Sequence, residues 1–283
     1  MKEVVSTIKH PAVVAARRSI GEVGGARATA FLVEGRKLVS EALAAGAAVE
    51  AVFALAPVED PADAAVVRSA EAAGAKCWLV SRGVFFRLLG LGYETAVRVL
   101  ATVTIPNPSL AEVIELASDD APVLVGERIQ DPRNVGVLIR TVDGLGSKSV
   151  VFAEGSADPY SRQSTRSSTG SIFRVRLAVG GSTTEVLGAL RARGMRIIGT
   201  SAGATIPCWE ADLSPPCAIV VGNETSGLSE EAVALSDALV RIPMFGGAHS
   251  LNVTVAAGVL LYEAARQREV GSAEPALSLR AGR

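Results

Sequence analysis

Residues 217–228 read CAIVVGNETSGL, an apolar run that passes directly into glycine, asparagine and glutamate. The second half of the chain repeats this theme in four further short runs, most of which pass into Gly, Ser, Thr or an acid: 122-PVLVGE, 149-SVVFAE, 195-MRIIGTSA and 239-LVRIPM. Continuous apolar runs of this length are typical of strands buried on both faces of a parallel sheet. We therefore predict a parallel α/β sheet, whose ligands bind at the carboxyl ends of the strands.

Helix-like segments separate these runs and are expected near residues 133–146, 183–193 and 250–267. The last of them, SLNVTVAAGVLLYEAARQ, is strongly apolar, and we expect it to be largely buried.

The first hundred residues form a separate α/β pattern. Its expected strands are 30-AFLVEG, 50-EAVFAL, 76-KCWLVS and 97-VRVLATVTI, and its expected helices lie at 35–45, 61–74 and 82–90. Pro106 and Pro108 then break any regular element. The predicted division is a first domain over residues 1–105, a linker over 106–120, a second domain over 121–267 and a mobile polar tail over 268–283.

The composition narrows the class of protein. A chain of 283 residues suits two domains, and 20% charged with 49% hydrophobic residues indicates a folded rather than a disordered chain. Its three cysteines, Cys77, Cys208 and Cys217, are too few and too scattered for a disulfide framework or a zinc site. No apolar run is long enough to span a membrane, and the first residues lack signal-peptide features. We expect a cytoplasmic protein with no metal centre and no membrane partner.

The net charge of −1 conceals two basic regions. Residues 1–37 carry seven Lys/Arg against three acids, and residues 128–176 carry eight against four. Such regions suit a polyanionic partner, but they also fit ordinary solvated surfaces, and charge alone leaves both readings open.

Polar residues and glycines follow two of the predicted strand ends, those of 122-PVLVGE and 217-CAIVVGNE. In 127-ERIQDPRNVGVLIRTVDGLG, Asn134 is expected near a helix cap, with Arg140 on the inner side of the second turn, where it could hold a phosphate. Gly222 and Gly227 would let a ligand approach the backbone closely. Each segment by itself also fits a plain strand–turn–helix connection.

A third segment, 241-RIPMFGGAHSLNV, opens the last helix. Ser250 could cap that helix, whereas Asn252 in its first turn needs a partner or a ligand. His249 and Ser250 are adjacent, so they cannot form a nucleophile–base pair, and no G-x-S-x-G elbow is present. Hydrolase chemistry is therefore excluded, and the lack of G-x-G-x-x-G disfavours a Rossmann-type nucleotide site.

Taken together, three motifs carry a resemblance: N-x-G-x-x-x-R at 134–140, G-N-E-x-x-G-L at 222–228, and I-P-M followed by S-L-N-V at 242–253. In order and spacing they resemble the signature motifs of the SpoU (TrmH-like) branch of the SPOUT RNA ribose 2′-O-methyltransferases. The stretch 166-RSSTGSIFRV is similar to the R-x-S-x-G-x-x-F element of that family. The resemblance covers roughly residues 120–267, and residues 1–105 are more loosely similar to an L30e-like or L7Ae-like substrate-binding domain.

This resemblance implies a C-terminal parallel-sheet SPOUT domain with a deep trefoil knot, preceded by a smaller L30e/L7Ae-like α/β domain. It also implies a homodimer through the C-terminal domain and S-adenosyl-L-methionine as cofactor. The implied catalytic residues are Arg140, Asn134, Glu224, Ser250 and Asn252. The implied cofactor-binding residues are Thr200, Ser201, Gly222, Asn223, Ile242, Met244, Ser250 and Leu251. The implied RNA-binding residues are Arg133, Arg166, Ser168, Arg17, Arg18, Arg36 and Lys37.

The expected reaction is methyl transfer from S-adenosylmethionine to a ribose 2′-hydroxyl of RNA. Because an arginine stays protonated, Arg140 is expected to orient the target phosphate and hydroxyl rather than to act as the base. The expected substrate is 23S rRNA, with resistance to a ribosome-targeting antibiotic as a further hypothesis. The alternatives are a tRNA ribose 2′-O-methyltransferase, a non-catalytic RNA-binding protein, and a small-molecule enzyme on an ordinary doubly wound sheet.

Overall fold

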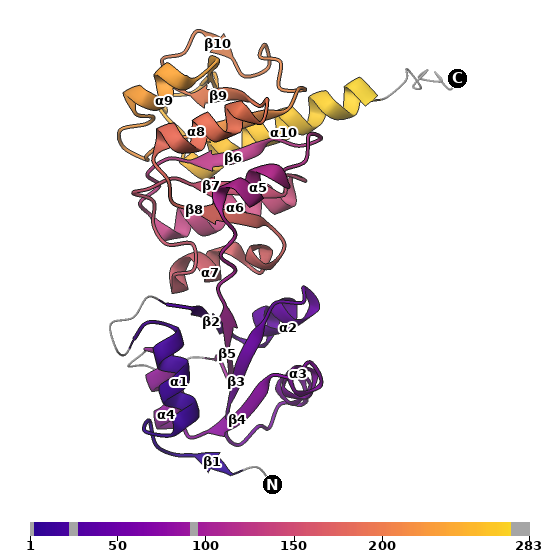
Figure 1. Ribbon diagram of the computed structural model, residues 1–283, viewed down its shortest axis with the longest axis vertical. Coiled ribbons are helices and arrows are strands. Elements are labelled where there is room, and N and C mark those ends of the chain that lie inside the picture. The colour runs from indigo at the N-terminus through magenta and orange to yellow at the C-terminus, as the bar shows by residue number, and fades with distance from the viewer. Residues whose placement is uncertain (1–2, 23–27, 91–95, 273–283) are drawn as a thin grey trace, which may run out of the picture. The chain divides into compact units, whose positions relative to one another are not determined.

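The computed structural model describes residues 3–22, 28–90 and 96–272. The contacts between residues divide the chain into two units (Figure 1). The first unit consists of Met1–Asn107 with Pro159–Arg174, and the second unit consists of Pro108–Asp158 with Val175–Arg283.

The first unit contains a five-stranded mixed sheet in the order β1-β4-β3-β5-β2. The strands are β1 (Val4–Val5), β2 (Ala30–Glu34), β3 (Val49–Leu55), β4 (Lys76–Val80) and β5 (Val99–Thr104). Strands β1, β4 and β3 are parallel neighbours, whereas β5 runs antiparallel to both β3 and β2.

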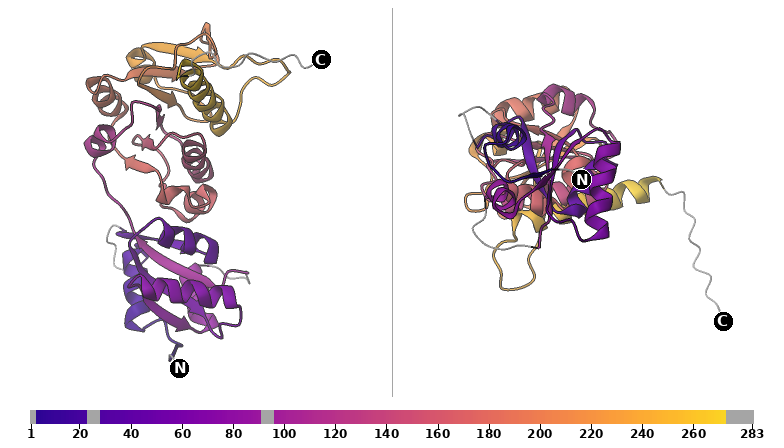
Figure 2. Two further views of the ribbon diagram at one scale, coloured as in Figure 1. Left: turned by 90° about the vertical axis from the view of Figure 1, so that its right-hand side faces the viewer. Right: turned by 90° about the horizontal axis from the view of Figure 1, so that it is seen from below.

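Helices cover both faces of this sheet (Figures 1 and 2). Helices α1 (Pro11–Ser19) and α4 (Arg82–Leu89) lie on one face, and α2 (Arg36–Ala44) and α3 (Pro61–Ala72) lie on the other. Phe85 of α4 is fully buried in one cluster with Phe53 of β3 and Leu100 of β5. Burial of each such side chain stabilises the fold by about 1.5–3 kcal/mol.

A polar segment from late in the chain also belongs to the first unit. It contains α7 (Arg162–Ser168) and the 3₁₀ helix η1 (Ser171–Phe173). The ring of Phe31 in β2 packs against Tyr160 and Phe173, with centroid distances of 5.2 and 6.1 Å. Glu34, whose side chain is 3% exposed, forms an ion pair with Arg162. These contacts group residues 159–174, which the sequence analysis assigned to the second domain, with the first unit.

The second unit contains a seven-stranded sheet in the order β10-β12-β9-β11-β6-β7-β8. The strands are β6 (Val123–Gly126), β7 (Ser149–Phe152), β8 (Arg176–Val179), β9 (Arg196–Thr200), β10 (Ile206–Pro207), β11 (Cys217–Val221) and β12 (Ala238–Arg241). Every pair of neighbouring strands is parallel. The predicted parallel α/β sheet is therefore confirmed.

Helices cover both faces of this second sheet (Figure 2). On one face, α5 (Leu110–Glu115), α8 (Thr183–Ala192) and α9 (Glu230–Leu235) pack on alternate strand residues such as Val123 and Val125. On the other face, α6 (Pro132–Gly144) packs against α10 (Val253–Ser272), which also contacts β11. The segment 106–120, expected as a linker, thus holds α5, whose start is closed by a capping box between Ser109 and Glu112.

Helix α10 corrects one expectation. Leu260, Leu261 and Ala264 are buried, but Val255, Val259 and Tyr262 are 49%, 37% and 62% exposed. Because these three residues are spaced by four and three positions, they share one face of the helix. The helix is therefore buried on one side only. Residues 268–272 of the predicted tail continue α10, and residues 273–283 lie outside the described residues.

The strands and helices expected from apolar periodicity are all present, with ends shifted by a few residues. Apolar periodicity did not predict β1, α1, α5, α7, η1, β8 and β10. Strands β1 and β10 have only two residues each, and the α7 sequence RQSTRSS is polar throughout. None of these three elements is therefore long or apolar enough to show a hydrophobic period. Within the described part of the chain, no helix is both long and apolar enough to cross a membrane.

Candidate active site

Three motif residues from distant parts of the sequence form a hydrogen-bonded chain in the second unit. The side-chain amide of Asn134 donates to Oε1 of Glu224 at 2.8 Å, and Nδ2 of Asn252 donates to Oδ1 of Asn134 at 3.2 Å. Asn134 is 90 positions from Glu224 and 118 from Asn252, so only the fold brings them together. We call Asn134, Glu224 and Asn252 the polar frame.

The start of α10 fixes one end of the polar frame. Oδ1 of Asn252 accepts hydrogen bonds from the backbone N–H of Thr254 at 2.8 Å and from its hydroxyl at 2.6 Å. The Asn252 carbonyl accepts the first helical bond, from Ala256 N–H. Asn252 is therefore the N-cap of α10. This corrects the expectation that Ser250 caps the helix and that Asn252 lies in its first turn.

The cap determines the direction of every hydrogen bond in the polar frame. Since Oδ1 of Asn252 faces the helix, its Nδ2 faces Asn134 and donates to Oδ1 there. The Nδ2 of Asn134 then requires an acceptor, which Glu224 supplies. Glu224 also accepts from the backbone N–H groups of Gln130 and Asp131, each at 3.3 Å. Partial burial raises the pKa of Glu224, but the hydrogen bonds from Asn134 and these backbone groups outweigh it and lower the pKa below its ordinary value. Glu224 is thus an anion at neutral pH.

The start of α6 differs from its expected form. Asp131 is the N-cap, since it accepts from the N–H of Arg133 at 2.8 Å, and Pro132 occupies the first helical position. Asn134 therefore lies in the first turn rather than at the cap. The Arg133 guanidinium also binds Asp131, at 2.7 Å, and together these bonds hold the pKa of that carboxyl below its usual range. Arg140, six residues beyond Asn134, is exposed and forms no hydrogen bond or ion pair with any described residue.

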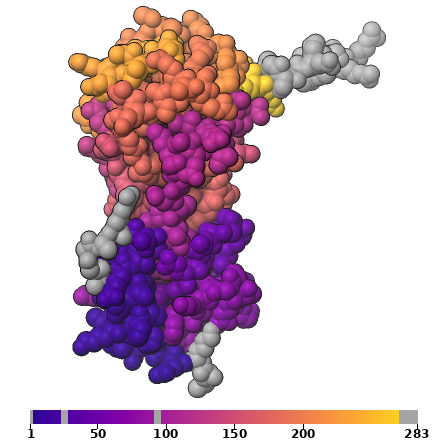
Figure 3. Space-filling view, viewed as in Figure 1, coloured from indigo at the N-terminus to yellow at the C-terminus, as the bar shows by residue number. Residues whose placement is uncertain are grey.

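A pocket lies at the carboxyl ends of β9 and β12 and at the start of α10. Its volume is about 150 Å³, and its lining is Thr200, Ser201, Ala202, Val240, Arg241, Ile242, Met244, His249, Ser250, Leu251, Ala256 and Leu260. The segments that follow β9 and β12, in orange shades, reach the surface of this unit (Figure 3). Leu251 directly precedes Asn252, so the pocket and the polar frame share one loop. Six of the eight predicted cofactor residues line this pocket: Thr200, Ser201, Ile242, Met244, Ser250 and Leu251.

Arg241 and His249 also line the pocket, and the sequence analysis did not assign them to the cofactor site. Both flank the I-P-M and S-L-N-V motifs directly, so proximity to those motifs was the available signal. In the sequence, His249 stands out only as the neighbour of Ser250, a pair that cannot support hydrolase chemistry.

The other two predicted cofactor residues, Gly222 and Asn223, do not belong to this lining. A Cβ on Gly222 would lie 2.3 Å from the backbone carbon of Gly227, so the turn itself requires this glycine. The Asn223 amide donates to the carbonyl of Arg128 at 3.0 Å and accepts from Thr225 N–H at 2.9 Å. Both residues thus shape the loop that carries Glu224, and their contact with a cofactor stays a prediction.

The predicted RNA-binding residues of the motif at 166–173 differ in accessibility. Arg166 has a 61% exposed side chain and lies 3.9 Å from Glu34. Ser168 is fully buried, and its hydroxyl donates to the carbonyl of Thr165 at 2.8 Å. Ser168 therefore cannot contact RNA in this structure. The expectation for this residue is wrong because its small side chain packs inside the turn that ends α7.

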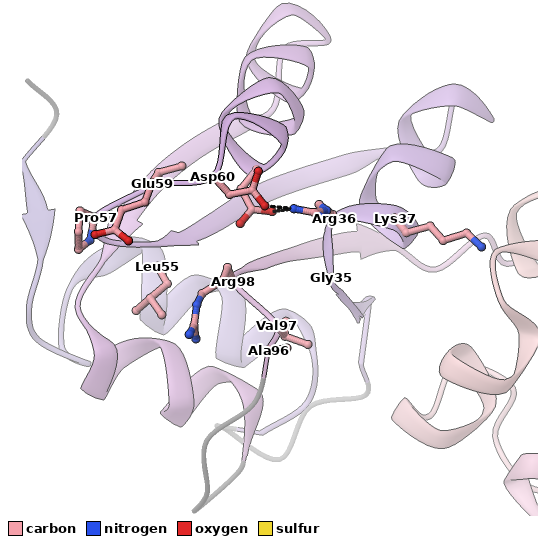
Figure 4. Close-up of a pocket in the computed structure, with 12 residues that line it drawn as sticks. Gly35, Arg36, Lys37, Leu55, Pro57, Glu59, Asp60, Ala96, Val97 and Arg98 are labelled. Carbon is pink, nitrogen blue, oxygen red and sulfur yellow. Dashed lines mark hydrogen bonds and ion pairs between the residues drawn. The ribbon is translucent and has the colours of Figure 1, made fainter.

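Four further predicted RNA-binding residues also lie in the first unit, whereas Arg133, already described at the start of α6, lies in the second. Arg17 is paired with Glu22 at 3.1 Å, whereas Arg18 is exposed. Arg36 and Lys37 line a cavity of about 530 Å³. Figure 4 shows the Arg36 side chain meeting Asp60 and the Lys37 side chain extending away from them. Arg36 is therefore largely neutralised, while Lys37 forms no ion pair within the described residues and is available to an anionic partner.

Residues 121–262 match the SpoU rRNA Methylase family. The chain is 31% identical to the 23S rRNA (guanosine(2553)-2′-O)-methyltransferase RlmP of Bacillus subtilis, over 82% of this chain and 87% of that protein. It is 38% identical to a 23S rRNA (uridine(2479)-2′-O)-methyltransferase of Streptomyces viridochromogenes, over 58% of this chain and 62% of that protein. The structure is similar to the SpoU methyltransferase AviRb from Streptomyces viridochromogenes in complex with AdoMet, with a TM-score of 0.79, 29% identity, and coverage of 93% of this chain and all of that chain.

Proposed function

The chain belongs to the SpoU rRNA methylase family, and we propose that it transfers a methyl group from S-adenosylmethionine to a ribose 2′-hydroxyl of 23S rRNA. The observation that carries the proposal is the polar frame, in which one residue from each of the three motifs meets beside the strand-end pocket. The two relatives named above are both 23S rRNA 2′-O-methyltransferases, and a similar structure contains AdoMet.

The residues of the pocket fit the proposed cofactor. Ile242, Leu251 and Leu260 provide apolar walls, and the strand ends at Thr200 and Val240 leave backbone groups close by. An apolar slot with a few backbone hydrogen-bonding groups suits an adenine ring. S-adenosylmethionine supplies an electrophilic methyl group on a sulfonium. Ser250 and Ser201 offer hydroxyls for its polar parts, and Gly222 and Asn223 act by shaping the neighbouring loop.

We assign the RNA side of the site to α6. Arg140 is exposed and unpaired among the described residues, so its guanidinium can bind a phosphate without first breaking an ion pair. Arginine remains protonated, so Arg140 orients the target phosphate and stabilises the 2′-oxygen, whose proton passes to solvent water as the O–CH3 bond forms and the S–CH3 bond breaks. Glu224 is held as an anion by its hydrogen bonds, and it fixes Asn134 rather than taking the proton itself. Positioning by this frame is expected to supply most of the rate.

Dimerisation through the second unit is part of the proposal. Val255, Val259 and Tyr262 form an exposed apolar face on α10, which a second copy of the chain would cover. We also propose that the segment between β12 and α10 is knotted, since β12 lies near one edge of the sheet while α10 packs on central β11. The first unit would serve as the L30e-like RNA-binding domain, with Arg18 and Lys37 as exposed basic residues. The expected compartment is the cytoplasm, where rRNA is found.

The proposal is tested by incubating the purified protein with labelled S-adenosylmethionine and unmodified 23S rRNA, 16S rRNA or tRNA. Digestion to nucleosides and mass spectrometry then identify the product. A 2′-O-methylated nucleoside from 23S rRNA supports the proposal, and the Arg140→Ala variant serves as the matched control. Product from tRNA alone would favour a tRNA enzyme. RNA binding without product, on naked RNA and on ribosomal subunits alike, would favour a non-catalytic RNA-binding protein.

Resistance to a ribosome-targeting antibiotic is a further proposal that follows from the 23S rRNA substrate. Expression of the gene in a susceptible host should raise the inhibitory concentration of such a drug, and the Arg140→Ala gene should not. An unchanged inhibitory concentration for the active gene across ribosome-directed drugs would refute it.

A further inference from the structure

Two large aromatic side chains lie exposed and parallel on the second unit. Phe245 is 90% exposed and Trp209 is 50% exposed. Their ring centroids are 6.4 Å apart and their planes differ by 6°. Parallel rings at this separation form an offset stack, so each ring keeps surface that is open to solvent. The second unit thus presents a flat aromatic surface, the Trp209–Phe245 pair, that its own packing does not use.

The pairing of strand β10 with strand β12 holds the Trp209–Phe245 pair next to the pocket. Strand β10 pairs with β12 so that Pro207 lies opposite Arg241, and Cys208 N–H donates to the Arg241 carbonyl at 2.8 Å. Trp209 follows Cys208 directly. Phe245 follows Met244, which lines the pocket. The backbone that carries each ring is therefore continuous with the proposed cofactor site.

The loop that carries Phe245 is open and free of negative charge. Residues 242–252 contain no acid, and Arg241 lies immediately before them. A Cβ added at Gly246 or Gly247 would meet no atom within 4 Å, so internal packing does not require either glycine. Exposure of a phenylalanine side chain to water is unfavourable, because burying it contributes about 1.5–3 kcal/mol of favourable free energy. A partner that covers the ring when the substrate binds would recover that energy.

We propose that the Trp209–Phe245 pair is a stacking surface for an unpaired base of the RNA substrate, next to the nucleotide whose ribose is methylated. This inference rests on the proposed function. A nucleobase is flat and apolar on its faces, so it matches a flat ring better than an irregular protein surface does. Stacking tolerates every base, so the pair holds the RNA strand open at the site, while other contacts choose the sequence.

The first test uses fluorescence and needs no turnover. Trp78 and Trp209 are the two tryptophans of the chain, so Trp78→Phe leaves Trp209 as the sole reporter. The full-length protein is titrated with an oligoadenylate RNA of roughly 12 nucleotides, and with an abasic ribose-phosphate chain of equal length. The oligoadenylate should quench Trp209 emission, and the abasic chain should not. Adding Phe245→Leu, which keeps an apolar side chain but removes the ring, should weaken the quenching titration about 5- to 100-fold.

The second test measures methylation of the RNA identified as substrate. Phe245→Leu should raise KM for RNA about 5- to 100-fold, whereas Phe245→Tyr, which keeps the ring, should stay within about twofold of the parent. Cofactor affinity by calorimetry should be unchanged in both variants. The matched control is Val233→Ala, which trims a 39% exposed side chain of the same unit and should leave KM unchanged.

The two tests separate the outcomes. Equal quenching by abasic and base-containing RNA, or an unchanged KM in Phe245→Leu, would overturn the stacking surface. A Phe245→Leu variant that sediments as a smaller species than the parent would show that the pair contacts a second copy of the chain, which also overturns it. Base-dependent quenching in a protein that methylates no RNA would leave the stacking surface standing while the proposed reaction fails.

Discussion

The fixed direction of the hydrogen bonds in the polar frame leads to a strong prediction for Asn134→Asp. The substitution keeps size and shape but turns the donor that faces Glu224 into a carboxylate oxygen. The 2.8 Å hydrogen bond to Glu224 becomes a contact between two anions. The bond from Asn252 to position 134 survives, because a carboxylate also accepts. The variant therefore tests the Asn134–Glu224 contact alone.

The magnitude follows from two effects. A hydrogen bond to a charged group contributes about 1.5–3 kcal/mol, and exposure of Glu224 favours the low end. Repulsion between unit charges near this distance is about 1.5 kcal/mol in water, and rotation of the carboxylates relieves part of it. The expected loss is about 2–3 kcal/mol, which for a unit of this size lowers Tm by roughly 4–12 °C.

Differential scanning calorimetry at two pH values measures this loss. In the parent, the lowered pKa of Glu224 means that its contribution is present above the ordinary glutamate pKa and declines as pH falls through the lowered value. In Asn134→Asp, repulsion raises the pKa of one carboxyl, and protonation then relieves the contact. Between about pH 7.5 and about pH 5 only the second effect acts, because the parent keeps its Glu224 contribution above the ordinary glutamate pKa. Protonation in the variant therefore shrinks the difference in Tm between parent and variant over this range.

A second substitution supplies the matched control. In Asn134→Asp with Glu224→Gln, the glutamine amide can donate to the new carboxylate, so a hydrogen bond of reversed direction replaces the lost one. The double variant should therefore be more stable than the sum of the two single losses by about 1 kcal/mol or more. A Tm for Asn134→Asp within about 2 °C of the parent at pH 7.5, or a strictly additive double variant, would refute the fixed hydrogen-bond direction.

Three further predictions concern other parts of the chain. Arg140→Ala should keep cofactor affinity but lower methyl transfer about 10²- to 10³-fold, measured by calorimetry and single-turnover kinetics; equal loss of both would contradict its role at the RNA. Glu34→Ala should destabilise the first unit by about 2–4 kcal/mol, because it leaves the Arg162 guanidinium without its buried partner; hydrogen exchange should increase across residues 159–174, and unchanged protection there would count against the grouping of this segment. Val259→Glu should convert a dimer to monomers in sedimentation, since it places a charge in the exposed apolar face of α10; a parent protein that is already monomeric would disprove the dimer.

The sequence by itself determined the parallel sheet of the second unit and most of its elements, but not α5, β8 or β10. Strands β6 and β11 are buried on both faces, so each is a continuous apolar run whatever its packing partners are. Such runs can be recognised from the sequence alone. The three motifs likewise identified the residues of the polar frame, through their resemblance to the SpoU signature motifs.

The tertiary structure decided how those residues are used. Asn252 caps α10 through local bonds from Thr254. The cap sets the direction of the polar frame only because Asn134 lies next to it in space, 118 positions away in the sequence, and no local pattern encodes that contact. The burial of Ser168 and the grouping of α7 with the first unit depend on Glu34 and Phe31, which precede α7 by more than a hundred residues. The Trp209–Phe245 pair exists only because β10 pairs with β12. Periodicity reports which face of an element is apolar, whereas the partner of each polar or aromatic side chain is chosen by long-range packing.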